Sequence, residues 1–132
     1  MGIFNLFKRN ERQYPSFEAL ENSEIKNKYF VRTMQWGWLN EKMIHVFDTF
    51  GPKPRMITMD PWPQQIYLDA DGSKTIREYV LWMANKYSRN QIPKELDETI
   101  LNVLNDLIRD GGMIELKDQK TALPENLNGP TS

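Results

Sequence analysis

The chain has 132 residues, of which 39% are hydrophobic and 27% are charged, and 11% of all residues are aromatic. This composition is too apolar for a disordered protein, and the length suits one hydrophobic core, so we expect a single domain over residues 1–132. Lys and Arg total 17 against 18 Asp and Glu, so a charged partner must be met by a local patch. The sequence has no cysteine, which excludes disulfides and cysteine-containing zinc sites.

The first residues, Met1–Arg9, place apolar side chains before two bases. That order would allow a weak membrane contact, and a frayed terminus is the alternative interpretation. No apolar run approaches the length of a membrane span, and Met1–Gln13 lacks the features of a signal peptide. We therefore expect a cytoplasmic protein.

Two helices and one strand are expected in the N-terminal half. Ser16–Lys28 suggests a short helix, and the aromatic and β-branched residues of Tyr29–Gln35 suggest a strand. Asn40–Phe50 is predicted to be an amphipathic helix that Asn40 caps, with His45 on its solvated side. The apolar stripe of this helix comprises Trp36, Leu39, Met43, Val46, Phe47 and Phe50.

The next elements are a strand at Arg55–Asp60 and a short helix at Pro61–Asp69. Asp71-Gly72 is predicted to form a turn. Thr75 and Glu78 match a capping box that opens a helix at Thr75–Ser88. Trp82 lies on the flank of that helix, where it is either covered by the N-terminal residues or exposed for a partner.

A longer helix is predicted at Pro93–Asp110, ending at Gly111-Gly112. Leu101 and Ile108 widen its apolar stripe, so they form either a groove wall or part of the core. Two short strands, Met113–Lys117 and Lys120–Leu123, should follow.

This order of elements is that of a winged helix over residues 55–123. We therefore expect a mainly α fold with a small β component. Residues 1–54 should form an N-terminal helical extension, with a possible short strand, packed on that winged-helix-like module, and residues 124–132 a flexible tail.

The stretch from Ile66 to Val80, in which an apolar helix ends at Asp-Gly before a Thr-apolar-x-Glu helix start, resembles the PqqD-like peptide-recognition domains. The resemblance covers roughly residues 57–116. It implies that a peptide adds as an extra strand beside Arg55–Asp60 and rests against the helix at Pro93–Asp110. The expected partner-binding residues are Arg55, Ile57, Met59, Leu101, Ile108 and Trp82.

The predicted function is therefore a non-enzymatic peptide- or protein-binding adaptor without metal or cofactor. One alternative is a DNA-binding regulator, but Pro93–Asp110 carries five acids against two bases and would be repelled by phosphates. A second alternative is an immunity-type protein that blocks a partner enzyme. Asp69, Asp71 and Glu78 also resemble part of a calcium loop, although Tyr67 replaces its first ligand. The common catalytic motifs are absent.

Overall fold

The computed structural model describes residues 14–88 and 90–131, which form two three-stranded antiparallel sheets and four α-helices. The first sheet has the order β5-β1-β6, with β1 at Tyr29–Arg32, β5 at Asp71–Thr75 and β6 at Ile114–Lys117. We call it the β1 sheet after its central strand. Both outer strands run antiparallel to β1 although they lie far from it in the sequence.

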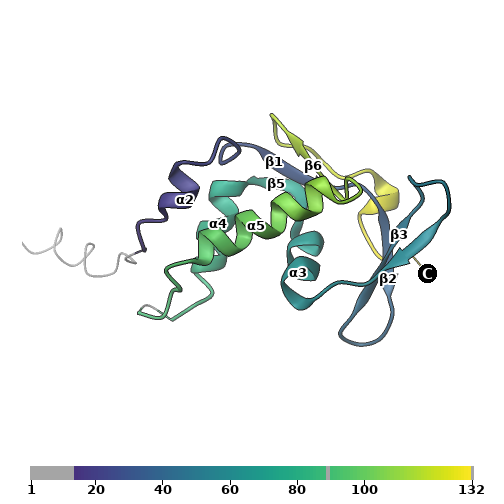
Figure 1. Cartoon of the computed structure of the whole chain (residues 1–132), viewed down its shortest axis with the longest axis horizontal. Helices are drawn as coiled ribbons and strands as arrows, with labels where there is room; N and C mark the ends of the chain where they lie inside the picture. The colour runs from purple at the N-terminus through teal and green to yellow at the C-terminus, as the bar shows by residue number, and fades with distance from the viewer. Residues whose placement is uncertain (1–13, 89, 132) are drawn as a thin grey trace, which may run out of the picture.

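The second sheet is the β3 sheet, with the order β2-β3-β4. Its strands are β2 at Gln35–Trp38, β3 at Ile44–Asp48 and β4 at Arg55–Ile57. In Figure 1 this sheet lies at the opposite end of the molecule from α2.

The helices are α2 at Glu18–Glu21, α3 at Pro61–Asp69, α4 at Ile76–Ala84 and α5 at Leu96–Arg109. α4 and α5 lie along one side of the β1 sheet, and α3 lies between them and the β3 sheet (Figure 1). A single apolar cluster contains residues from all four helices and from strands of both sheets. The two sheets and the helices therefore share one core.

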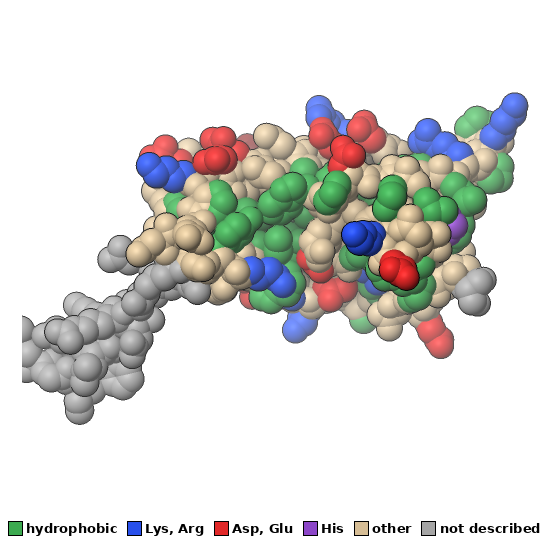
Figure 2. Space-filling model, turned by 90° about the horizontal axis from the view of Figure 1, so that it is seen from below, with side chains coloured by type: hydrophobic (Ala, Val, Ile, Leu, Met, Phe, Trp, Pro, Cys, Tyr) green, Lys and Arg blue, Asp and Glu red, His purple; other side chains and the backbone are tan. Residues whose placement is uncertain are grey.

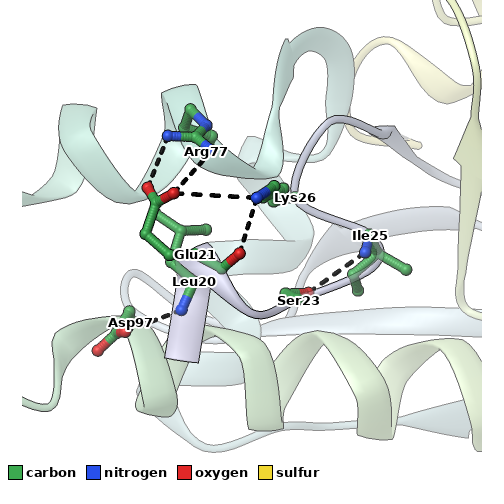
Figure 3. Close-up of polar contacts among 7 residues, drawn as sticks. All are labelled: Leu20, Glu21, Ser23, Ile25, Lys26, Arg77 and Asp97. Atoms are coloured by element: carbon green, nitrogen blue, oxygen red, sulfur yellow. Dashed lines mark hydrogen bonds and ion pairs between the residues drawn. The ribbon is translucent and has the colours of Figure 1, made fainter. Parts of the chain in front are cut away.

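The short helix α2 is hydrogen-bonded to α4 and α5 (Figure 3). The backbone N–H of Leu20 donates to the Asp97 carboxylate on α5 at 3.0 Å. Arg77 on α4 donates to the Glu21 carboxylate at 2.7 Å, and Lys26 donates to the Glu21 carbonyl at 2.7 Å. Asp97 is only 2% exposed, so its hydrogen bond to α2 satisfies a charge that would be costly to bury alone.

The predicted capping box at the start of α4 is confirmed: Glu78 N–H donates to the Thr75 hydroxyl, and Thr75 N–H donates to the Glu78 carboxylate. The next amides also find partners, because Ile76 N–H and Arg77 N–H donate to the Lys28 and Lys26 carbonyls at 3.0 and 2.9 Å. The first turn of α4 is therefore bonded to the residues that precede β1.

After β6 the chain crosses back over the β1 sheet as the C-terminal segment, residues 118–131. Thr121 N–H donates to the Gly72 carbonyl on β5 at 3.0 Å. Gly72 has a φ of 78°, and a Cβ placed there would lie 2.0 Å from the Thr121 carbonyl oxygen. Further along, Leu127 accepts a hydrogen bond from Arg32, and Thr131 N–H donates to the Trp36 carbonyl on β2 at 2.6 Å.

The prediction of a mainly α fold is wrong, because two three-stranded sheets stand beside the helices in a mixed α/β arrangement. Residues 1–54 were expected to form a helical extension with a possible short strand at Tyr29–Gln35. β1 lies within that stretch, but the described part also supplies β2 and β3. The expected strand at Lys120–Leu123 is irregular, and β6 pairs with β1 instead of with a neighbouring hairpin strand. The winged-helix-like module with a helical extension is therefore not the fold of this chain.

The helix predicted at Asn40–Phe50 is wrong as well. Ile44–Asp48 is the central strand of its sheet, paired with β2 on one side and β4 on the other, and this tertiary pairing prevails over the helical spacing of its apolar residues. Asn40, expected as a helix cap, lies in the turn before β3, where its side chain accepts from the Lys42 and Met43 amides. The same asparagine chemistry suits a helix start and a tight turn. His45 is half-buried beside Phe47, with ring centroids 4.8 Å apart.

The turn predicted at Asp71-Gly72 is also wrong, since both residues begin β5. α3 spans Pro61–Asp69 as expected, and α4 and α5 lie within their predicted ranges, with α5 ending just before Gly111-Gly112. Both of these glycines have positive φ, which lets the chain reverse direction there. Of the helix predicted at Ser16–Lys28, only Glu18–Glu21 is helical. None of the described helices has the length and hydropathy needed to cross a bilayer.

Candidate binding groove

The hydrogen-bond direction along β3 can be deduced from the turn that precedes it. Leu39 N–H donates to the Met43 carbonyl at 2.8 Å, so the backbone of Met43, just before β3, faces the β2 side of the hairpin. Backbone groups of an antiparallel strand alternate between its two sides. The backbones of Ile44, Val46 and Asp48 therefore face away from β2. In agreement with this, the Ile44 N–H donates to a side chain of α3 and not to β2.

The same alternation places the backbone groups of β4. Val46 lies opposite Ile57, and Asp48 lies opposite Arg55. Because Val46 and Asp48 direct their backbones toward β4, Arg55 and Ile57 are the residues that bond to β3. Met56, between them, directs its N–H and C=O away from the sheet, and 62% of its surface is exposed. The outer edge of β4 therefore presents an open donor and acceptor.

A groove with a volume of about 460 Å³ borders β4, and its lining includes Arg55 and Ile57 but not Met56. One wall is formed by β4 and the residues after it, and the other by the last turns of α5 together with the start of α3. The lining is apolar in its middle and acidic at several points. The residues that line it are Met43, Arg55, Ile57, Thr58, Met59, Asp60, Pro63, Asp106, Leu107, Asp110 and Met113.

Arg55 lies on β4 where the two walls of the groove come close together. Its Nε donates to the Asp48 carboxylate at 2.8 Å, and Asp48 also accepts from the Phe50 N–H at 3.0 Å. The Arg55 hydrogen bond, followed by that from Phe50, holds the pKa of Asp48 below its ordinary value. On the other side, a Cβ on Gly111 would lie 3.8 Å from Arg55 Nη2, so β4 approaches the end of α5 here.

The structure brings three of the expected site residues together, since Arg55, Ile57 and Met59 all line the groove. Leu101 is 7% exposed and belongs to the core, and Ile108 lines a different cavity. The face that α5 turns toward the groove carries Asp106, Leu107 and Asp110. A signal for this face was present in the sequence, because two acids four positions apart lie on one side of a helix.

Trp82, the sixth expected residue, lies on α4 and is not among the residues that line the groove. Its ring is 36% exposed and stacks on Tyr79 with centroids 5.7 Å apart. The ammonium groups of Lys74 and Lys86 lie 4.7 and 4.1 Å from the ring centroid. These cation–π contacts give Trp82 a local role in packing α4.

A larger cavity, of about 790 Å³, borders β6 and contains Ile108 in its lining. Part of its wall is the chain's own C-terminal segment, which contributes Thr121 and Leu127. Arg32, also in the lining, is 5% exposed and donates to the Leu68 and Leu127 carbonyls at 2.8 and 2.9 Å. Burial lowers the pKa of its guanidinium. Arg32 therefore holds the C-terminal segment in place.

The carboxylates of the calcium alternative have other partners in the fold. Asp69 accepts from the Tyr79 hydroxyl at 2.7 Å, and Asp71 accepts from the Ser73 side chain at 2.6 Å. Glu78 belongs to the capping box of α4. Across residues 14–88 and 90–131, no three His, Asp or Glu side chains gather as a metal site would require.

Comparisons with protein-family models, with curated proteins and with solved structures gave no match. The groove is therefore interpreted from its own geometry and chemistry.

Proposed function

We propose that this protein is a non-enzymatic cytoplasmic adaptor that binds a peptide, or an extended segment of a protein, as an additional strand beside β4. The main support is the outward N–H and C=O of Met56, which lies between Arg55 and Ile57, two residues that line the groove. An added strand would bond to these groups, and its side chains would enter the groove. The PqqD-like resemblance implies the same mode of binding at the same strand.

The energetics favour a short but specific contact. Each backbone hydrogen bond contributes about 0.5–1.5 kcal/mol net, so a few bonds to β4 give only weak affinity. The groove can add to this by burying apolar side chains against Ile57, Met59 and Leu107. Backbone bonds would set the direction of the bound strand, and the groove would select its side chains.

The test begins with peptides selected from a random twelve-residue phage-displayed library on the immobilised full chain. The dissociation constant of the most enriched peptide is then compared between Met56→Pro and Met56→Ala. Proline removes the outward N–H, and an edge strand tolerates proline at a position whose N–H faces solvent. Alanine keeps the N–H and removes only the side chain, which makes it the matched control.

We expect Met56→Pro to weaken binding about 2- to 10-fold, which is the effect of losing one strand hydrogen bond, and Met56→Ala to bind like the parent chain. Amide shifts on peptide addition should be largest in Arg55–Ile57 and the last turns of α5. Equal binding by the two variants, or shifts confined to other elements, would show that strand addition at β4 is wrong.

Binding to DNA receives less support from the same surface. Asp106 and Asp110 line the groove from the end of α5, and carboxylates there repel a phosphate backbone. A mobility-shift assay with duplex DNA at low salt should show no retardation.

A further inference from the structure

The carboxylates around the groove bear on which peptides it accepts. Asp60 lines it at the start of α3, and Asp106 and Asp110 line it at the end of α5. Arg55 is the single base among the described lining residues. Seen from below in Figure 2, acidic and basic side chains are scattered around a band of hydrophobic ones, so charge effects on that face are local as well. The groove differs from that face because the charged residues in its lining are mainly acidic.

The positive charge of Arg55 is already matched within the protein. Its partner Asp48 has a side chain only 5% exposed, and the two groups are hydrogen-bonded at 2.8 Å. Asp106 pairs with Arg109 at 3.1 Å, but both side chains are well exposed, so this pair is weak. Asp60 and Asp110 have no ion-pair partner within 4.0 Å among the residues that the structure describes. The groove is therefore left with an excess of negative charge.

We infer that the groove selects a basic peptide, in which Lys or Arg alternates with apolar residues on the side that faces α5. This inference rests on the proposed strand addition at β4. Every second side chain of an added strand points the same way. On the side of the strand that faces the groove, a basic residue can therefore lie near the acids of α5. The apolar residues two positions before and after it can contact Ile57 and Leu107. Each exposed pair of opposite charges should tighten binding roughly 2- to 5-fold.

The test uses the same library of displayed twelve-residue peptides on the full chain and on a double variant, Asp106→Lys with Asp110→Lys. Both positions are exposed and lie at the C-terminal end of α5, where basic residues stabilise a helix, so the variant should fold. A control, Glu18→Lys with Glu24→Lys, makes the same change in net charge at exposed positions near α2.

We expect the peptides enriched on the parent chain and on the control to carry more Lys and Arg than the starting library. On the groove variant that enrichment should vanish or turn toward Asp and Glu, and a Lys-rich peptide should bind it about tenfold more weakly. Raising the salt concentration should weaken binding of the same peptide to the parent chain.

The outcomes separate this inference from the proposed function. Enriched peptides without a basic bias, bound in a way that still needs the Met56 N–H, would overturn the charge preference and leave strand addition in place. A basic bias that survives in the groove variant would overturn it too. If no peptide is enriched over uncoated beads, or Met56→Pro binds as well as Met56→Ala, strand addition fails and the inference fails with it.

Discussion

The two outer strands of the β3 sheet differ in what covers them. At β2, the Trp36 carbonyl accepts the Thr131 N–H, and a Cβ on Gly37 would lie 3.0 Å from the Thr131 carbonyl oxygen. At β4, the outward groups of Met56 meet no backbone partner within the described residues. An exposed strand edge promotes unwanted pairing. This protein covers the edge of β2 and leaves the edge of β4 open near a groove, and that difference favours a binding role for β4.

The open edge is also kept short. β4 has only three residues, and Pro52 and Pro54 lie just before it. Proline lacks the N–H that a partner strand needs, so pairing cannot extend in that direction. A ligand must therefore gain much of its affinity from side chains in the groove, which limits nonspecific pairing with other strands.

The largest expected effect comes from a substitution at Gly72, over which the C-terminal segment passes on its way to β2. Gly72→Ala places a methyl group 2.0 Å from the Thr121 carbonyl oxygen on a backbone with a φ of 78°. We expect a loss of about 2–4 kcal/mol in the free energy of unfolding, measured by urea denaturation. Displacing the segment should also uncover β2.

Gly112→Ala is the control for that substitution, because Gly112 also has a positive φ, 65°, but has no atom within 4 Å of an added Cβ. It should cost about 1–2 kcal/mol, the backbone strain alone. Equal losses in the two variants would contradict a steric role for the passage of the segment over Gly72.

A smaller effect is expected from removing a single bond at the covered edge. Thr131→Pro deletes the N–H that binds the Trp36 carbonyl, whereas Thr131→Ala retains it. The proline variant should be about 1 kcal/mol less stable than the alanine variant and should self-associate more at high concentration, which sedimentation would detect. Peptide binding at β4 should be the same in both. A change there would mean that the two edges are not independent.

The smallest effect concerns pH and the ion pair that aligns β4. The pKa of Asp48 lies below its ordinary value of 3.8 because Arg55 donates to it. Its stabilising contribution is thus fully present only well above that ordinary value and is lost as the pH falls through the lowered pKa. Arg55→Met should reduce the loss of stability between pH 5 and pH 2 in urea titrations. Lys53→Met, which removes an exposed base from the same loop, should leave that loss unchanged.

The helices were largely predictable from the sequence because their signals are local. Pro61 at the first position of α3, the capping box of Thr75 and Glu78, and the glycines after α5 each mark a boundary within a few residues. β5 could not be found in this way, since Asp71–Thr75 has no alternation of apolar side chains. It is a strand because β1 lies beside it, which is a tertiary effect.

The candidate groove was predictable on one wall only. The strand signal in Arg55–Asp60 led to Arg55, Ile57 and Met59, which lie together in the groove. The other wall depends on how α5 is rotated about its axis, and that rotation is set by its packing on the β1 sheet and α3. Apolar excess pointed to Leu101 and Ile108, whereas the acids that flank Leu107 mark the face toward the groove.

The way α4 begins has a consequence for folding kinetics. Thr75 is both the last residue of β5 and the N-cap of α4, and the next two amides bond to carbonyls that precede β1. The helix start is therefore complete only after chain segments distant in sequence have met. Contacts of that kind are slow to form because a long loop must close first. We expect α4 to consolidate together with the β1 sheet, after collapse, and not as an early local helix.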